Sequence, residues 1–304
     1  MESKTILILV LIASALALFL IGAYLAGFAI EDQDNNLIYV KSNITYSNGA
    51  VVNIWIESEE NLDVLRDNDI KYLFVDVGDT SLEGKLETEE SEITSFIMLI
   101  ESYERKNNYD FILLPYSEVN TYTYDLESRN FKENLITDYK MLIELGFDGA
   151  YVDIEPIQFY QRGYYLSFLD ELSNQIPSGK ILSVYSGSFG DSDNEWEWSP
   201  EFYKQVSSRV DLIFVPGYDT HYNSKSEYQR YIEDQVNEID SQDFGTEFII
   251  GIPTHKSSPE TIGNALEAFN NAMSDKDNEI VGVAVFAEWT ATEKDWQTFD
   301  KYFN

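Results

Sequence analysis

Two carboxylic acids, Asp153 and Glu155, stand two positions apart in the segment GFDGAYVDIEP, residues 146–156. The segment follows an amphipathic helical pattern and reads as a buried β-strand, in which side chains two positions apart share one face. Carboxyl groups this close cannot both ionise easily, so the pKa of one is raised, as a general acid near neutral pH requires. The spacing predicts acid–base chemistry. The alternative is that Glu155 only binds a loop amide or a nearby lysine.

Eight short apolar runs predict the strands that hold such acids, and eight helical patterns alternate with them. Near-continuous apolar runs are typical of a parallel sheet that is covered on both faces. This count predicts an α/β fold of the (β/α)8 TIM barrel type. An open doubly wound sheet is less favoured, because no glycine-rich phosphate loop follows the first strand. The predicted strands are 51–56, 70–77, 111–116, 149–154, 180–185, 211–218, 248–253 and 280–287.

The composition argues against several classes of protein. Among 304 residues, 54 are Asp or Glu and 20 are Lys or Arg, which gives a formal net charge of -34. This balance argues against nucleic-acid binding through a basic surface, and the dispersed acids are interpreted as a solvated surface. The chain has no Cys, and its two His, His221 and His255, lack metal-ligand spacing. We therefore expect no metal and no cofactor.

The N-terminal segment is strongly apolar, with no charged residue in residues 5–30. This length exceeds the roughly 20 residues that span a hydrocarbon core as a helix. We therefore expect a transmembrane anchor or a cleaved signal segment in residues 1–30, a polar linker over 31–49 and one barrel domain over 50–304. Lys4 before the apolar segment and acids after it predict a single-pass protein with the barrel outside the cell membrane, or a secreted protein after cleavage.

The acidic segment resembles the signature of glycoside hydrolase family 18, the chitinases and endo-N-acetylglucosaminidases, whose pattern D-G-x-D-x-D-x-E ends the fourth strand of a (β/α)8 barrel. Asp148, Gly149, Asp153 and Glu155 match it, and Tyr151 replaces the middle Asp. The resemblance implies a retaining, substrate-assisted glycosidase, in which Glu155 protonates the leaving oxygen and Asp153 holds the substrate N-acetyl group. The family's middle Asp shares a proton with the next one, so its replacement by Tyr151 predicts that Asp153 ionises more readily.

Two further strand ends resemble the same family. VPGYDT ends the sixth predicted strand with Tyr218 and Asp219, and the resemblance implies that this phenol donates a hydrogen bond to the N-acetyl carbonyl. VFAEWTAT ends the eighth with Trp289, which by resemblance forms the floor of the sugar subsite. Trp289 stands two residues later than the family's Trp, and a period of two keeps it on the same face of the strand.

Other strand ends are predicted to line a sugar-binding cleft. Aromatic faces stack on sugar rings and acids bind hydroxyl groups. The loop 192–200 carries Trp196 and Trp198, and it is either an outer subsite or a helix-capping loop whose Trp side chains cover the core. The further candidates for the cleft are Trp55, Asp76, Asp79, Tyr116, Glu118 and Tyr185.

Three functions fit these residues. The preferred one is a substrate-assisted glycosidase that acts on a polysaccharide or glycan containing N-acetylhexosamine. The second is a two-carboxylate glycosidase in which Glu288 or Asp219 acts as nucleophile opposite Glu155, at a separation of about 5–5.5 Å. The third is a non-catalytic carbohydrate-binding or cell-envelope barrel, for which Tyr151 is the main argument, because fold alone does not establish activity.

Overall fold

The computed structural model describes residues 46–56, 58–190, 194–273 and 279–303. They belong to one compact unit, Ser42–Asn304. The expected anchor or signal segment and most of the expected linker lie outside the described residues. Within the described ranges, no helix has both the length and the apolar character needed to cross a bilayer.

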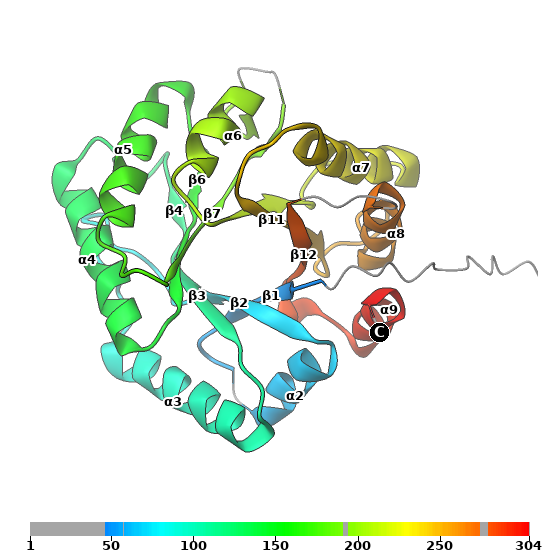
Figure 1. Cartoon of the computed structure of the whole chain (residues 1–304), viewed down its shortest axis with the longest axis horizontal. Coiled ribbons are helices and arrows are strands. Elements are labelled where there is room, and N and C mark those ends of the chain that lie inside the picture. Colours follow the sequence, from blue (N-terminus) through cyan, green and yellow to red (C-terminus); the bar gives the residue numbers. More distant parts are fainter. Residues whose placement is uncertain (1–45, 57, 191–193, 274–278, 304) are drawn as a thin grey trace, which may run out of the picture. The chain divides into compact units, whose positions relative to one another are not determined.

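Eight parallel strands form one sheet that curves into a barrel (Figure 1), in the order β3-β2-β1-β12-β11-β10-β7-β5. Each of the eight predicted strands is present, so the (β/α)8 prediction is confirmed for this unit. The first strand begins earlier than predicted and ends at Asn53, which leaves Trp55 in the following turn. The strands of this sheet are β1 (Asn48–Asn53), β2 (Ile70–Asp76), β3 (Ile112–Tyr116), β5 (Gly149–Val152), β7 (Ile181–Tyr185), β10 (Leu212–Pro216), β11 (Glu247–Pro253) and β12 (Ile280–Phe286).

The strands β3 and β5 close the barrel without a continuous ladder between them. The Asp148 backbone N–H donates a hydrogen bond to Leu113 O at 2.9 Å, and Asp148 Oδ2 accepts one from Leu113 N at 3.0 Å. Nearer the C-terminal ends of the strands, β4 (Val119–Asn120) pairs in parallel with β6 (Ile154–Glu155). Glu155 therefore lies in the short ladder that completes the barrel wall.

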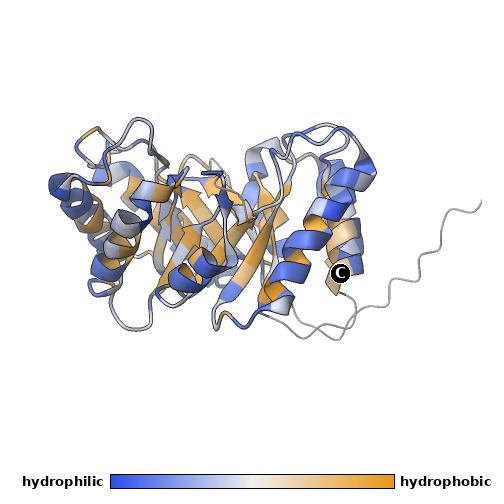
Figure 2. Ribbon diagram, turned by 90° about the horizontal axis from the view of Figure 1, so that it is seen from above, coloured by the Kyte–Doolittle hydropathy of each residue, from blue (hydrophilic) through white to orange (hydrophobic). Residues whose placement is uncertain are grey.

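Aromatic side chains fill the barrel interior. The ring of Phe74 contacts Tyr151 with centroids 4.8 Å apart and Phe214 at 5.1 Å, both in edge-on geometry. This inner cluster contains only residues of strands and of the loops that follow them. A larger hydrophobic cluster lies between the strands and the helices. Figure 2 shows the same arrangement, with apolar strands at the centre and polar outer faces on the helices.

Helices follow the strands and surround them (Figure 1). Several begin at a serine cap; for example, Ser199 Oγ accepts a hydrogen bond from Phe202 N at 3.3 Å, which satisfies one of the free donors at a helix start. The short strands β8 (Ser188–Phe189) and β9 (Glu197–Trp198) pair in parallel before this helix. The helices are α2 (Glu59–Asp67), α3 (Glu90–Asn107), α4 (Arg129–Leu145), α5 (Arg162–Ser173), α6 (Pro200–Ser207), α7 (Lys225–Ser241), α8 (Ile262–Met273) and α9 (Glu293–Phe303).

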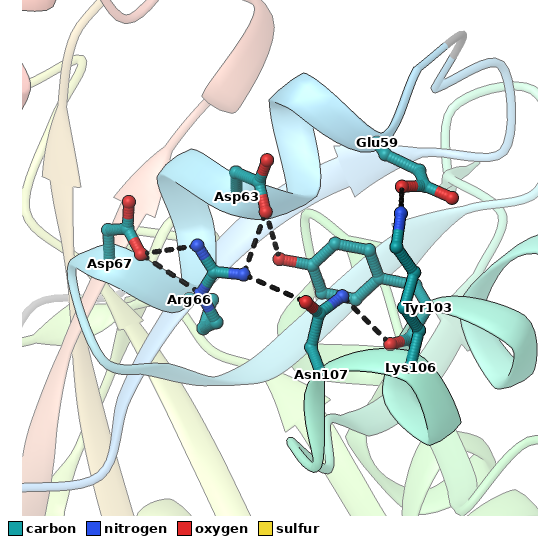
Figure 3. A network of polar contacts seen from close by, with 7 residues as sticks. All are labelled: Glu59, Asp63, Arg66, Asp67, Tyr103, Lys106 and Asn107. Carbon is teal, nitrogen blue, oxygen red and sulfur yellow. Dashed lines mark hydrogen bonds and ion pairs between the residues drawn. The ribbon is translucent and has the colours of Figure 1, made fainter.

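A polar network joins α2 to α3 on the outer surface (Figure 3). Arg66 forms ion pairs with Asp63 at 2.8 Å and with Asp67 at 2.7 Å, and the Tyr103 hydroxyl donates a hydrogen bond to Asp63 at 2.8 Å. Lys106 forms a further ion pair with the first turn of α2. Exposed pairs of this kind stabilise a fold by only about 0–1 kcal/mol each, so the apolar clusters dominate the stability of the barrel.

Candidate active site

The C-terminal ends of neighbouring strands bring two carboxyl groups and two phenols together. Asp153 and Glu155 follow β5, Tyr185 ends β7 and Tyr218 follows β10. Hydrogen bonds link Tyr185 to Glu155 and to Tyr218, and the charges of both acids act on the two phenols. The structure thus places the three predicted catalytic residues, Asp153, Glu155 and Tyr218, in one cluster with the predicted binding residue Tyr185.

Glu155 is half-buried, and this burial is the main reason that its pKa rises to about 7. The nearby charges of Glu118 and Asp219 raise the pKa further, and the hydrogen bond from Tyr185 lowers it. A carboxyl group with this pKa is partly protonated at neutral pH. Glu155 can therefore donate a proton at a pH at which an ordinary glutamate is fully ionised.

Asp153 is 9% exposed, and its Oδ1 has no hydrogen-bond partner among the described residues. Burial raises its pKa well above the usual range, and the charges of Glu155, Glu118 and Asp76 add to this effect. The prediction that Asp153 ionises more readily with Tyr151 than with an acid at the same position stays a prediction, because it compares this chain with one that carries a carboxyl group at position 151. Tyr151 brings no carboxyl group beside Asp153, and it belongs to the apolar cluster that fills the barrel interior.

A pocket of about 490 Å³ opens beside Glu155. Glu155, Tyr185 and Tyr218 line it, together with the segments Asn194–Trp198 and Asp219–Tyr222. Its volume lies in the range of about 300–1,000 Å³ that is usual for small-ligand sites. Within the described ranges, no group of three or more His, Asp or Glu could hold a metal ion.

The two Trp residues of the predicted outer subsite have different roles. Trp196 lines the pocket and is 46% exposed, so its ring is available to a ligand. Trp198 also borders the pocket but is 1% exposed, and its ring packs on Phe202 with centroids 4.9 Å apart. The loop therefore has features of both predicted interpretations, with an exposed ring in the pocket at Trp196 and a core residue at Trp198.

Glu260 was not predicted as a site residue, yet it holds the loop after β10. Its buried carboxylate accepts hydrogen bonds from Asp219 N at 2.8 Å, Thr220 N at 3.0 Å and Thr220 Oγ1 at 2.6 Å. Asp219 has a positive φ of 56°, an uncommon conformation that this carboxylate stabilises. The side chain of Asp219 forms an ion pair with Lys256, and one of its oxygens lies 3.6 Å from His255 Nε2.

The aromatic side chain at the end of β12 that reaches the site is Phe286, and sequence reasoning missed it. Its ring stacks on Tyr218 with centroids 4.4 Å apart and an interplanar angle of 19°. Trp289 lies beyond the strand in the 3₁₀ turn η2 (Glu288–Thr290), is 48% exposed and does not line the pocket. The expected strand face does not apply to it, because the extended backbone ends at Phe286. Glu288 accepts a hydrogen bond from Asn61 Nδ2 at 2.8 Å and also lies outside the pocket lining.

Seven other residues predicted for the motif or the cleft do not line the pocket: Asp148, Tyr151, Trp55, Asp76, Asp79, Tyr116 and Glu118. Asp148 lies just before β5, where it forms an ion pair with Lys180 at 3.3 Å and makes the hydrogen bonds to Leu113 that join β3 to β5. Trp55 is 53% exposed in the turn after β1. Burial is the main reason that the pKa of Tyr116 and the pKa of Asp153 are raised, and the nearby carboxylate of Asp76 adds to both. Burial also raises the pKa of Asp76 itself.

Comparisons with solved structures show which proteins share this barrel fold. Neither a protein-family model nor a curated protein sequence matches this chain. A class V chitinase structure from Pseudomonas fluorescens superposes with a TM-score of 0.63 and 14% identity, over 86% of this chain and 100% of that one. The spore cortex-lytic enzyme SleL of Bacillus cereus gives a TM-score of 0.61 and 12% identity, over 86% of this chain and 75% of that one.

A chitinase structure from Chromobacterium violaceum gives a TM-score of 0.60 and 11% identity, over 85% of this chain and 99% of that one. These likenesses establish a (β/α)8 fold of the chitinase type. The resemblance to chitinases that the fourth-strand motif indicates is thereby confirmed at the level of the fold.

Proposed function

We propose that this chain is a glycoside hydrolase that acts on a polysaccharide or glycan containing N-acetylhexosamine, by a retaining, substrate-assisted mechanism. The observation that carries the proposal is the position of Glu155, whose pKa burial raises to about 7, in a pocket wall next to the buried Asp153. The chitinase-type fold supports the same class of reaction.

In this mechanism Glu155 protonates the oxygen of the leaving sugar while the acetamido carbonyl oxygen of the substrate attacks the anomeric carbon. A cyclic oxazolinium intermediate forms as the glycosidic bond breaks. The acetamido N–H supplies the donor that Asp153 Oδ1 lacks, and the Tyr218 hydroxyl donates a hydrogen bond to the carbonyl oxygen. Water then attacks the anomeric carbon and gives its proton to the Glu155 carboxylate, which restores the acetamido group with retention.

Hydrolysis of chromogenic N-acetylchitooligosaccharides by the purified full-length chain tests this proposal. Glu155→Gln keeps the size of the side chain and removes the proton donor, so we expect turnover to fall by about 10²–10⁴-fold. Circular dichroism of the variant checks that the barrel is folded. Equal turnover by the wild type and by folded Glu155→Gln would refute the role of Glu155, and binding without turnover by the wild type would favour the non-catalytic barrel.

A two-carboxylate mechanism has one specific observation in its favour, because Asp219 lines the same pocket and its charge raises the pKa of Glu155. Trapping with a 2-deoxy-2-fluoro glycoside distinguishes the two mechanisms. A covalent sugar on Asp219, detected by peptide mass spectrometry, would assign the nucleophile to this residue. Inhibition by a thiazoline analogue of the cyclic intermediate would support substrate assistance.

We also propose that residues 1–30 anchor the enzyme in the cell membrane with the barrel outside, on the basis of the uncharged segment 5–30. Secretion after cleavage is the alternative. Fractionation of cells that express the full chain, followed by protease treatment of intact cells, separates the two. An anchored barrel stays with the membrane and is digested from outside, and a cleaved one is found in the medium with a shortened N-terminus.

A further inference from the structure

The pocket beside Glu155 carries acids and no basic side chain except one exposed histidine. The described residues that line it include four carboxylic acids, and neither Lys nor Arg is among them. The histidine, His221, lies on the exposed part of the Asp219–Tyr222 segment. The four acids are Glu155, Glu195, Glu197 and Asp219.

The basic residues near the pocket have other contacts. Lys256 forms an ion pair with Asp219, and the buried Glu260 also acts on its charge. Arg162 donates a hydrogen bond to the backbone oxygen of Glu197 at 3.2 Å, and its guanidinium lies 4.6 Å from the centre of the Phe202 ring, so it packs behind the pocket wall. Glu195 is hydrogen-bonded to the neutral hydroxyl of Tyr122. No cation in the described part of the chain forms an ion pair with Glu195.

An aromatic surface lies within the same wall. Trp196 is exposed and stands between Glu195 and Glu197 in the sequence. Glu195, Trp196 and Glu197 all line the pocket, so a sugar ring that packs on this indole lies in the same pocket as the two acids. An ammonium group on that sugar is attracted to the carboxylates and to the face of the indole ring. A carboxylate group on the sugar is repelled by the same acids.

From this lining we propose that the pocket selects glycans by charge, and that it prefers a partly N-acetylated hexosamine polymer with free amino groups to a polymer whose sugars carry carboxylates. The inference rests on the proposed function and names its substrate class. The sugar that reacts must keep its acetamido group, because this group is the nucleophile. The sugars on either side can carry ammonium groups, which the acidic wall favours.

Binding to the full-length Glu155→Gln chain tests the preference without interference from turnover. The probes are three hexasaccharides of one backbone: fully N-acetylated, half deacetylated, and fully N-acetylated with 6-O-carboxymethyl groups. At an ionic strength of about 0.01 M we expect the deacetylated probe to bind about 1.5- to fivefold more tightly per engaged acid than the neutral one, and the carboxymethyl probe to bind more weakly. At about 1 M salt, where charges are screened, the three affinities should converge.

A second variant tests whether the acids of the pocket wall cause the expected order of affinities among the three probes. Adding Glu195→Gln to the Glu155→Gln chain should reduce the preference for the deacetylated probe by about 1.5- to fivefold. Glu144→Gln, near the end of α4, removes the same charge from an exposed site outside the pocket lining and should leave the preference unchanged. Equal loss in both variants would assign the effect to net charge and overturn the proposal.

The outcomes separate this inference from the proposed function. Hydrolysis of the neutral hexasaccharide by the wild type, with equal binding of all three probes, would keep the glycosidase and overturn charge selection. The predicted order of binding without hydrolysis of any probe would support charge selection and remove the glycosidase. Tighter binding of the carboxymethyl probe than of the neutral one, or no binding of any probe, would overturn the inference.

Discussion

The ring of Tyr218 stacks on the ring of Phe286, and this contact joins the ends of β10 and β12 at the candidate site. The strand between them, β11, carries Gly251 at this level. A Cβ atom at position 251 would lie 2.5 Å from Phe214 Cε1 and 2.8 Å from Tyr218 Cε1. The position of the Tyr218 phenol therefore depends on the absence of a side chain at this residue.

Gly251→Ala should displace Tyr218 and lower kcat. Forcing a methyl group into a filled core usually costs about 1–3 kcal/mol, so the free energy of unfolding should fall as well. Gly163→Ala in α5 is the matched control, because a Cβ there meets nothing within 4 Å and alanine favours a helix. The two variants are compared by kcat and by urea unfolding. Wild-type kcat and stability in Gly251→Ala would show that the strand can shift to accept the methyl group.

The pKa of Glu155 predicts a descending alkaline limb in the pH–rate profile. Catalysis requires the protonated acid, so kcat/KM should fall as the pH rises through about 7. Tyr185→Phe removes the hydrogen bond that lowers this pKa, and the fall should then move to higher pH. Tyr164→Phe, which changes an exposed phenol on α5, should leave the profile unchanged. A limb that shifts to lower pH in Tyr185→Phe would contradict the assignment of Glu155 as the titrating acid.

Asp153→Asn should increase stability while it removes activity. The folded-state pKa of Asp153 is raised by burial, so the unfolded chain releases this proton at lower pH than the folded chain does. Below about pH 4 Asp153 is protonated in both the folded and the unfolded chain, so it does not lower the free energy of unfolding. As the pH rises above this value, the wild type loses stability by up to about 1.4 kcal/mol per pH unit until the folded-state group ionises. The asparagine variant lacks this loss.

Urea unfolding of the wild type and of Asp153→Asn at pH 4, 5.5 and 7 measures the difference in their free energies of unfolding. This difference should be small at pH 4 and should grow toward pH 7. Asp138→Asn is a useful comparison, because burial also raises the pKa of Asp138 but the hydrogen bond from Leu86 N at 2.6 Å lowers it, so the gain in stability with pH should be smaller. A stability difference for Asp153→Asn that is constant with pH would mean that the acid is ionised in the folded protein throughout this range.

The strands were predictable because each has the short apolar run that burial on both faces demands, and the order along the chain fixes a parallel barrel. Asp153 and Glu155 were predictable because a strand places alternate side chains on one face. Phe286 and Glu260 were not, since their roles depend on Tyr218 and on the Asp219–Thr220 loop, which lie far from them in the sequence.

The errors have a common physical cause. Trp289 was placed on a strand face, but the extended backbone ends before it and η2 begins. Asp148 matched a motif position, yet it lies at the opposite end of its strand from the pocket. Period and spacing define a face of a strand, and they do not define where the strand ends or how much water reaches it.

Glu260→Gln should destabilise the loop that contains Asp219 and Thr220 and thereby lower the activity of the site. In the wild type each carboxylate oxygen accepts a hydrogen bond from a backbone N–H. In the variant the glutamine NH₂ replaces one of these oxygens, so one buried backbone donor loses its acceptor and the free energy of unfolding falls by about 1–3 kcal/mol. Because Glu260 is absent from the pocket lining, we expect a lower kcat through displacement of the loop. The profile of kcat against pH should also change, since Asp219 acts on the pKa of Glu155. An unchanged pH profile with reduced stability alone would limit Glu260 to a structural role.

Substitutions of Tyr151 test whether activity needs an acid at the middle position of the motif. Its ring lies 4.8 Å from Phe74 and 5.2 Å from Tyr116, centroid to centroid, within the inner cluster. Tyr151→Phe keeps these contacts, so it should keep the fold and most of the activity. Tyr151→Asp removes a buried ring, a change that costs about 3–5 kcal/mol in comparable cores, and it buries another carboxyl group beside Asp153. We expect a less stable protein whose kcat falls. Higher kcat in a fully folded Tyr151→Asp variant would show that the aromatic interior limits catalysis and that proton sharing between two acids is the better arrangement here.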